Sequence, residues 1–341
     1  MSTTAGVFSE TVLQNIRAMA SARMMDERIK LNYVAQTDVA QIIPKVQTAK
    51  LGELQGAGTK KKYTVEIEWA NNCAIVAEDC EYCAEGGPEL STNTTTVSID
   101  HCVQAPFSVN GVSFIDNDFD TQDMIADGLL TADKVISEEL CHRFLDWLVA
   151  NAGIANWPPL EPAGIGTVVG NEVRITGANF TIAAVGYLQK VLQYDRIQWT
   201  NNISGNQLFN AYQNVGFTEG WIPEGIGTTK RVSTFPILFD LFNFSAAGYN
   251  DRIISLANGS IAFCSASYYT PQVTMVDSEQ AVYTMSSRFF PGLVLEVWMK
   301  KTCDHDLTLY DFNVKGRYEF VQNPAGCDQN NNGIIQFVQF P

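Results

Sequence analysis

Apolar residues recur every three or four positions between Thr131 and Gly153, and this is the clearest helical pattern in the chain. An α-helix, with about 3.6 residues per turn, would place these residues on one face. Thr131 is a suitable N-cap, and Asp133 would lie in the first turn, where its charge suits the helix dipole. The pattern therefore predicts a helix over residues 131–152 that is stopped by Gly153. Its apolar stripe would consist of Val135, Ile136, Leu140, Phe144, Leu145 and Leu148.

Two segments upstream of this helix alternate apolar and polar residues, which is the pattern of half-buried strands. They are Tyr63–Ala70 and Thr94–Val103, and the polar, Gly- and Pro-containing segment Ala77–Asn93 separates them. This spacing predicts a long antiparallel hairpin with an acidic tip. Because a lone hairpin is marginally stable in water, we expect its apolar face to pack on another copy of the chain.

The remaining segments have weaker patterns. Residues 1–50 indicate an extended arm, and the Gly-rich segment 51–60 indicates a break. Pro106–Leu130 is predicted to be a loop with short helical character. From residue 216 onward the chain reads as short aromatic-rich strands, and from Gly292 onward as longer strands.

Composition favours a globular protein, since 46% of the 341 residues are hydrophobic and 17% are charged. No apolar run approaches the roughly 20 residues that cross a bilayer, and the N-terminus lacks the pattern of a signal peptide. The formal net charge of −15 argues against a module that grips nucleic-acid phosphates through a basic face. It remains compatible with a container whose acidic wall does not adhere to enclosed DNA, and also with simple solubility.

The one metal-like pattern is Cys73-x6-Cys80-x2-Cys83, with His101 and Cys102 downstream. Thiolates at C-x2-C spacing suit tetrahedral zinc, but a single pair is a weak signal. Unpaired thiols are the favoured interpretation, and a disulfide in the loop tip or between subunits is a further alternative. The remaining cysteines are also expected to be free thiols. They are Cys141, Cys264, Cys303 and Cys327.

Other candidate groups have structural interpretations. The acidic run Asp116, Asp118, Asp120 and Asp123 lacks the glycine and glutamate of a calcium-binding EF-hand loop, so a solvated loop before a helix explains it better. His101, His142 and His305 have no nucleophile in a recognisable context, and no phosphate-binding or hydrolase motif occurs. The sequence therefore predicts no catalytic, cofactor-binding or metal-binding residue, and a protein that is not an enzyme. Core or interface packing is expected for the tryptophans Trp147, Trp157, Trp199, Trp221 and Trp298.

The order of these elements resembles that of a known family. The hairpin comes from KKKYTVEIEW and TTTVSIDHCV, and the long helix from LLTADKVISEELCHRFLDWLVANAG. Then come NFTIAAVGYLQKVL, FPILFDLFNF and NGSIAF, and finally LYDFNVKGRYEFVQNPAG. This succession is similar to that of the major capsid proteins of tailed bacteriophages, which have the Hong Kong 97-type fold.

The resemblance implies an α+β fold with five parts. These are an N-terminal arm (1–50), an extended-loop hairpin (51–103), a peripheral domain with a spine helix (104–165, helix 131–152), an axial domain (166–290) and return strands of the peripheral domain (291–341). The stripe of the spine helix should pack against a sheet built from residues near 95–115 and 292–341. Cys141 and His142 would then be side chains of a structural strut.

The resemblance also implies a function. The chain would self-assemble into hexamers and pentamers of an icosahedral phage head that encloses double-stranded DNA without sequence-specific binding. Portal, scaffold or decoration proteins would be further partners, with assembly in the host cytoplasm, the virion as final location and no membrane. Some members cross-link a lysine of the extended loop to a neighbour, but Lys60, Lys61 and Lys62 lie at the base of the hairpin, so this chemistry is not carried over. The alternatives are an encapsulin-like shell and, less favoured, a zinc-binding or redox protein that uses Cys73, Cys80 and Cys83.

Overall fold

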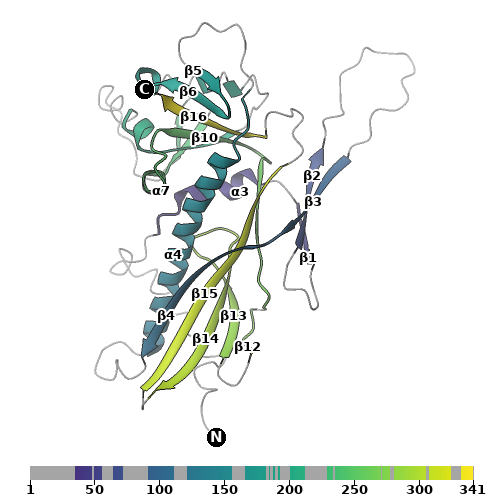
Figure 1. Ribbon diagram of the computed structural model, residues 1–341, viewed down its shortest axis with the longest axis vertical. Coiled ribbons are helices and arrows are strands. Elements are labelled where there is room, and N and C mark those ends of the chain that lie inside the picture. Colours follow the sequence, from purple (N-terminus) through teal and green to yellow (C-terminus); the bar gives the residue numbers. More distant parts are fainter. Residues whose placement is uncertain are drawn as a thin grey trace, which may run out of the picture. The chain divides into compact units, whose positions relative to one another are not determined.

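The structure is a computed structural model, shown in Figure 1. The chain divides into two compact units. Unit 1 contains residues 1–37, 99–140 and 264–319, and unit 2 contains residues 38–98, 141–263 and 320–341. The residues that the structure describes are 35–47, 50–55, 64–71, 91–110, 121–155, 166–181, 184, 187, 188, 191, 192, 200–211, 229–232, 235–269, 271–276, 280–304, 307–323 and 332–340.

Helices and strands are mixed along the chain, as the sequence predicts. No helix among the described residues is long and apolar enough to cross a membrane. The helices with described bounds are η1 (Asp38–Ile42), α3 (Ile43–Val46), α4 (Thr121–Ala150), η2 (Gly177–Asn179) and α7 (Leu241–Ala246). One sheet lies mainly in unit 1. Its strands are β4 (His101–Asn110), β11 (Ile261–Ser265), β12 (Thr274–Met275), β13 (Gln280–Ser286), β14 (Val294–Asp304) and β15 (Leu307–Gln322).

Unit 1 is built on long antiparallel strands. The sheet has the order β11-β15-β14-β13-β12, and β4 also pairs with β15. In this register Phe312 of β15 lies opposite Met299 of β14 and Phe107 of β4. Successive side chains of a strand point to opposite faces. Phe312 and Val314 are therefore buried on one face, while Asp311, Asn313 and Lys315 are half-buried on the other. We call these the inner and the outer face of the sheet.

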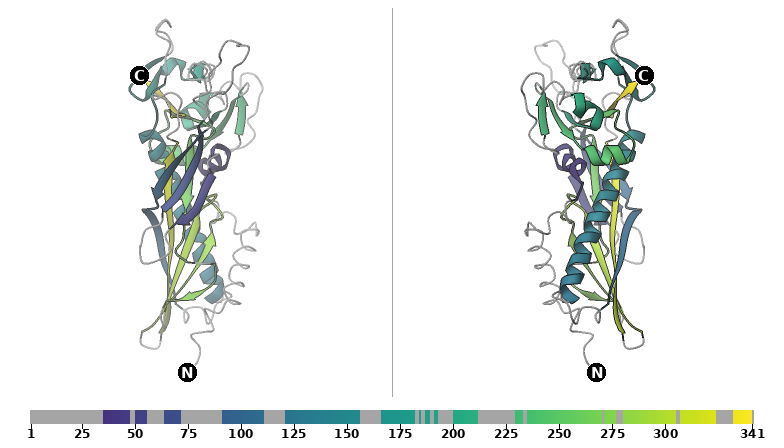
Figure 2. Two further views of the ribbon diagram at one scale, coloured as in Figure 1. Left: turned by 90° about the vertical axis from the view of Figure 1, so that its right-hand side faces the viewer. Right: turned by 90° about the vertical axis from the view of Figure 1, so that its left-hand side faces the viewer.

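The first part of α4 packs on the inner face, as Figure 2 shows. A Cβ atom added to Gly316 of β15 would lie 3.5 Å from Ile136 Cγ2 of the helix. A Cβ atom added to Gly128 of α4 would lie 2.3 Å from Phe107 Cε2 of β4. Both glycines therefore allow helix and strands to approach closely. The predicted packing of the helix on strands from both ends of the chain is confirmed.

The predicted start of this helix is wrong, because α4 begins at Thr121 and not at Thr131, and it ends at Ala150. The segment Pro106–Leu130, predicted to be a loop with short helical character, contributes its first residues to β4 (His101–Asn110) and its residues from Thr121 onward to α4, and 111–120 lie outside the described residues. Gly128 lies inside the helix at the contact with Phe107. A requirement for space at one position therefore outweighed the low helix propensity of glycine.

Asp133 is consequently not a first-turn residue. Its side chain is fully buried and accepts hydrogen bonds from Ser287 Oγ (2.5 Å), Arg288 N (2.9 Å) and Ser137 Oγ (3.2 Å). Ser287 Oγ also accepts from the backbone N–H of Phe290 (3.0 Å), so this hydroxyl organises the turn between β13 and β14. Burial is the largest cause that raises the pKa of Asp133 above its ordinary value.

Five of the six predicted stripe residues of α4 are fully buried. The prediction for the sixth, Val135, is wrong, because this side chain is 50% exposed. In unit 2 the second part of α4 contacts aromatic residues. The ring of Phe144 lies 5.0 Å from that of Phe320, and Tyr249 donates a hydrogen bond to Asp146 Oδ1 at 2.8 Å. The buried stripe residues are Ile136, Leu140, Phe144, Leu145 and Leu148.

Unit 2 contains a seven-stranded sheet with the order β5-β6-β16-β10-β7-β9-β8. One face carries a core that includes Ile175, Ile253 and Phe337, together with Leu188 and Leu192 from a helical segment. The strand β16 pairs antiparallel with β10 and parallel with β6, so it is an interior strand of this sheet. The strands are β5 (Gly166–Val169), β6 (Glu172–Thr176), β7 (Thr200–Ser204), β8 (Thr229–Val232), β9 (Phe235–Phe239), β10 (Arg252–Ala257) and β16 (Ile334–Phe340).

The residues before the hairpin are held to unit 2. Val39 N, in η1, donates to Asp240 Oδ2 at 2.8 Å, and Asp240 Oδ1 accepts from Asn243 N, which caps α7. Further along, Gly259 N donates to Val46 O at 2.7 Å. Val39 and Val46 are fully buried. The segment 38–47, predicted to be part of an extended arm, is therefore short helix packed into unit 2.

The predicted hairpin is a three-stranded sheet of β1 (Lys50–Gln55), β2 (Thr64–Asn71) and β3 (Ser91–Ser98). The Gly-rich segment 51–60 was expected to be a break, but residues 51–55 belong to β1, whose register is irregular between Leu51 and Leu54; residues 56–60 lie outside the described part of the chain. The second predicted hairpin strand is divided, because the chain leaves β2 after Ser98 and pairs with β15 from His101 onward. Apolar and polar residues alternate without interruption through this segment, so the sequence pattern does not reveal that the pairing changes from β2 to β15.

The apolar face of β2 is already covered within one chain. Val65, Ile67 and Trp69 are at most 5% exposed. Burial of this face therefore does not require another copy of the chain, contrary to the prediction. The acidic tip between β2 and β3 lies outside the described residues.

Candidate functional site

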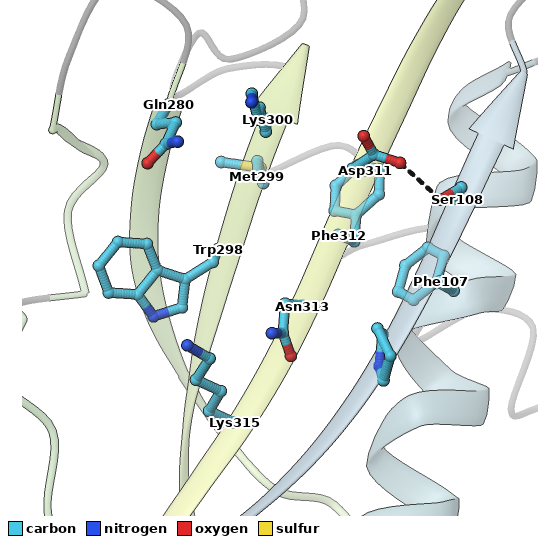
Figure 3. A pocket seen from close by; sticks show the side chains of 11 residues that line it. Phe107, Ser108, Gln280, Trp298, Met299, Lys300, Asp311, Phe312, Asn313 and Lys315 are labelled. Carbon is cyan, nitrogen blue, oxygen red and sulfur yellow. Dashed lines mark hydrogen bonds between the residues drawn. The ribbon is translucent and has the colours of Figure 1, made fainter. Parts of the chain in front are cut away.

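An open hollow of about 420 Å³ lies on the outer face of the unit 1 sheet, over β4, β15, β14 and β13 (Figure 3). Alternation along each strand turns polar and aromatic side chains toward it. No histidine or cysteine is among the lining residues. They are Pro106, Phe107, Ser108, Gln280, Trp298, Met299, Lys300, Asp311, Phe312, Asn313 and Lys315.

Hydrogen bonds across the strands order one side of the hollow. Ser108 Oγ of β4 donates to Asp311 Oδ1 of β15 at 2.6 Å, as Figure 3 shows. Thr302 Oγ1 of β14 donates to the other carboxylate oxygen, Oδ2, at 3.3 Å. Asn313 Nδ2 donates to Gln104 Oε1 at 3.3 Å. Asp311 is thereby held from both sides, and its carboxylate lines the hollow together with Lys300 and Lys315.

Trp298 forms the opposite side of the hollow. Lys315 Nζ lies 5.1 Å from the centre of its ring, within the range of a cation–π interaction. Tyr269 contacts the same ring edge-on at 5.1 Å between centroids. Trp298 Nε1 donates to Glu296 Oε2 at 3.3 Å. The indole is thus held in one orientation beside a lysine that lines the hollow.

Glu296 supports this arrangement from the same face, although it is only 1% exposed. Its Oε1 accepts from Ser267 Oγ (3.1 Å) and Tyr268 N (3.0 Å) and lies 3.7 Å from Arg317 Nε. The Arg317 guanidinium lies over the ring of Tyr268 at 4.7 Å. A buried carboxylate with a nearby cation and several donors is a structural group here. The outer face is therefore suited to holding a partner through charge and apolar contact.

The three cysteines of the metal-like pattern, Cys73, Cys80 and Cys83, lie outside the described residues. Cys102 lies on β4 as an exposed free thiol. Its neighbour His101 lies with Nδ1 2.7 Å from Glu319 Oε2 of β15. Among the residues that the structure describes, no group of three metal-binding side chains lies close together.

Other predicted candidates occupy structural positions. His142 of α4 lies with its ring 6.3 Å from that of Phe242. Cys141 and Cys264 are buried, and burial raises the pKa of the Cys264 thiol to about 11, so it remains protonated at neutral pH. His305, Cys327, Lys60, Lys61 and Lys62 lie outside the described part of the chain, and for Cys303 only the strand is described.

The acidic run is only partly described. Asp123 lies in the first turn of α4, where it suits the helix dipole, whereas Asp116, Asp118 and Asp120 precede the described residues. Of the tryptophans, Trp147 packs on Phe320 at 5.8 Å. Trp157, Trp199 and Trp221 lie outside the description. Trp298 was predicted to be a packing residue, and it also lines the hollow.

Sequence reasoning missed the hollow itself. Lys300 and Lys315 are 15 positions apart in the sequence and line the same hollow only because β14 and β15 form an antiparallel pair. The sequence did contain one signal for this face. Polar residues alternate with mostly apolar ones along 311–319, which places Asp311, Asn313 and Lys315 on one face. The pairing that joins them to β4 could not be derived from local pattern.

Comparisons with known proteins give structural similarities alone. No family model matches the chain, and no curated protein matches it. The capsid structure of the cyanophage P-SCSP1u is similar, with 9% sequence identity and a TM-score of 0.46 over 83% of this chain and 85% of that chain. The mature capsid of bacteriophage PhiM1 has 9% identity and a TM-score of 0.44, over 82% and 83% of the two chains. The SrpI encapsulin complex from Synechococcus elongatus PCC 7942 has 11% identity and a TM-score of 0.41, over 73% and 77%.

Proposed function

We propose that this chain is the major capsid protein of a tailed bacteriophage, and that it builds a shell from copies of itself. The observation that carries the proposal is the composite architecture of unit 1. A helix of 30 residues packs on a sheet whose longest strands have 11 and 16 residues. A hairpin sheet comes before β4 and α4 in the sequence, and a separate seven-stranded sheet belongs to unit 2.

This architecture has mechanical features rather than catalytic ones. The long helix is fixed to the sheet by close glycine contacts and by the buried Asp133, so unit 1 is a stiff layer. The hollow on the other face offers lysines, an indole and amide groups to a partner. Large overlapping contacts between copies, rather than turnover, would use these features.

In the finer form of the proposal, copies associate into hexamers and pentamers and close into an icosahedral head around double-stranded DNA. The net charge of −15 supports enclosure without adhesion, because an acidic wall repels phosphates. Portal, scaffold or decoration proteins would be partners of the shell. Assembly would occur in the host cytoplasm, and the virion would be the final location.

Electron microscopy and analytical ultracentrifugation of the purified full-length chain test the proposal. We expect concentration-dependent formation of rings or closed particles of uniform size. A chain that stays monomeric at every concentration, with or without its phage-encoded partners, would contradict it. Particles that contain protein cargo rather than DNA when isolated from cells would instead favour an encapsulin-like shell.

A further inference from the structure

The hollow on the outer face of unit 1 has a chemistry of its own that general contacts between copies do not explain. Its lining combines one large aromatic ring with charged and amide groups, as Figure 3 shows. Donors and acceptors of hydrogen bonds lie together around a volume of about 420 Å³, which is within the range of small-molecule sites. These groups belong to Trp298, Gln280, Asn313, Asp311, Lys300 and Lys315.

This lining argues against three classes of ligand. Among the described residues that form it there is one carboxylate and neither histidine nor cysteine, which does not make a metal site. Asp311 shares the hollow with two lysines, so a phosphate or a carboxylate would meet repulsion as well as attraction. An aliphatic chain would cover charged groups without offering them hydrogen bonds. A ligand with many hydroxyl groups meets none of these objections, because each hydroxyl both donates and accepts.

Two acceptors of the hollow are ready for such hydroxyls. Asn313 Nδ2 donates to Gln104 Oε1, whereas Asn313 Oδ1 is buried and accepts no hydrogen bond from the residues that the structure describes. A buried acceptor without a donor lowers stability, and a donating hydroxyl removes this cost. Ser108 and Thr302 each donate to one oxygen of Asp311. Since a carboxylate oxygen accepts two hydrogen bonds, Asp311 keeps capacity for a ligand.

Trp298 supplies an apolar surface in a fixed orientation. Its Nε1 donates to Glu296, and Tyr269 contacts the ring edge-on. Lys315 Nζ lies over the ring at 5.1 Å, so the negative face of the indole already attracts a positive group. One face of a pyranose ring carries weakly positive C–H groups, which suit the same ring face. The flexible stem of Lys315 lets its ammonium turn from the indole to a sugar hydroxyl.

We propose that the hollow of unit 1 is a binding site for a neutral saccharide unit of the size of one hexose ring. The C–H face of the pyranose lies on Trp298, and its hydroxyls donate to Asp311 and Asn313. Other hydroxyls accept from the two lysines. This inference goes beyond the proposed shell function and does not depend on it, because a single copy contains the whole site.

Saturation-transfer NMR and titration on the full-length chain test the site with the methyl glycosides of glucose, galactose and N-acetylglucosamine. We expect at least one of them to bind with a dissociation constant on the order of 1 mM, which is typical of a ligand of this size at an open site. Saturation should reach the C–H protons of the sugar ring more strongly than the methyl group. If none of the three binds at about 50 mM, the proposal is overturned.

Variants locate the ligand. We expect Trp298→Leu to weaken binding about tenfold and Asn313→Ala to weaken it about threefold or more. Lys300→Ala should also weaken it, whereas Lys301→Ala is the matched control, because Lys301 is the next residue of β14 and points to the opposite face. Circular dichroism checks that each variant folds, and if Trp298→Leu does not, Asn313→Ala decides. Unchanged affinity in the folded variants would place the sugar elsewhere and overturn the proposal.

Competition and salt distinguish the saccharide from other occupants. Binding of a neutral ligand should change less than about twofold between about 50 mM and about 500 mM salt. An oligothymidine that displaces the glycoside at low salt would make the hollow a nucleic-acid site and overturn the proposal. Displacement by an equal concentration of glycerol, which has no ring face, would overturn it as well.

Assembled particles give the last comparison. They should bind the glycoside with the affinity of the free chain. Loss of binding on assembly would show that another copy covers the hollow, and would overturn the proposal. A chain that binds the glycoside but never assembles refutes the shell function alone, whereas an assembling chain that binds none of the sugars refutes only this inference.

Discussion

The two faces of the unit 1 sheet are ordered by different means. On the inner face, apolar residues such as Val314 are fully buried beneath a helix of the same chain. On the outer face, side chains of the strands order one another, through Ser108–Asp311, Lys315–Trp298 and the contacts of Glu296. The inner face is therefore ordered by apolar burial, while the outer face is ordered by hydrogen bonds and ring contacts among its own side chains.

The largest expected difference between the faces concerns two neighbours on β15. Phe312 points inward, is 3% exposed and stacks on Phe107 at 4.8 Å. We expect Phe312→Ala to lower the free energy of unfolding by about 3–5 kcal/mol, because it leaves a cavity. Chemical denaturation followed by circular dichroism measures this loss.

The adjacent outward residue serves as the control. Asn313→Ala removes one hydrogen bond of 3.3 Å to Gln104 and creates no cavity in the inner layer. We expect a loss of about 1 kcal/mol or less. Equal losses for the two variants would show that the faces do not differ in the way described.

Overpacking the contact between helix and sheet should have the next largest effect. A Cβ atom on Gly316 would lie 3.3 Å from Leu293 Cδ1 and from Leu295 Cδ2, in addition to its approach to Ile136. We expect Gly316→Val to destabilise unit 1 by about 1–3 kcal/mol. Gly316→Ala should cost less, since the leucine side chains can move by a few tenths of an ångström. A valine variant as stable as the wild type, in a thermal melt, would mean that helix and strand are not closely packed.

Asp133 makes the inner face sensitive to pH. Burial raises its pKa in the folded state, so the folded chain binds this proton more tightly than the unfolded chain does. The contribution to stability is present below the ordinary pKa and is lost as pH rises through the raised pKa. In Asp133→Asn the donors keep an acceptor and this loss disappears. Urea denaturation of both proteins from about pH 4 to pH 7 should show stability falling more with pH in the wild type; parallel curves would contradict this.

The smallest effect is expected at the outer end of β4. His101 lies 2.7 Å from Glu319, but its side chain is 62% exposed. Exposed ion pairs contribute little, so His101→Asn should change the free energy of unfolding by less than about 0.5 kcal/mol. A much larger loss would show that this exposed pair at the start of β4 contributes to folding.

These elements also show what can be predicted from local pattern. Ile136, Leu140 and Phe144 were predicted to share the buried stripe, and each is fully buried, because helical periodicity is local information. The helix start was predicted too late, from Thr131 as N-cap, and the part that was missed contains Gly128, whose close contact is with Phe107 on another element. Local rules assign a glycine to a break unless its neighbour in space is known.

The candidate site was less predictable than the fold. Asp133 meets Ser287 across 154 positions, and Ser108 meets Asp311 across 203. No periodicity of a single segment contains such pairs. Alternation could identify which residues of β15 point outward, but the hollow also required the register of β4 and β14 against it.

The pairing of β4 with β15 has a consequence for synthesis of the chain. β4 emerges from the ribosome early, whereas its partner emerges about 200 residues later. At translation speeds of about 5–20 residues per second, β4 waits roughly 10–40 s before its edge is covered. The outer hollow contains side chains from both strands, so it cannot exist on a nascent chain. The hollow is therefore a feature of the finished chain, which forms only once β15 has emerged and paired with β4.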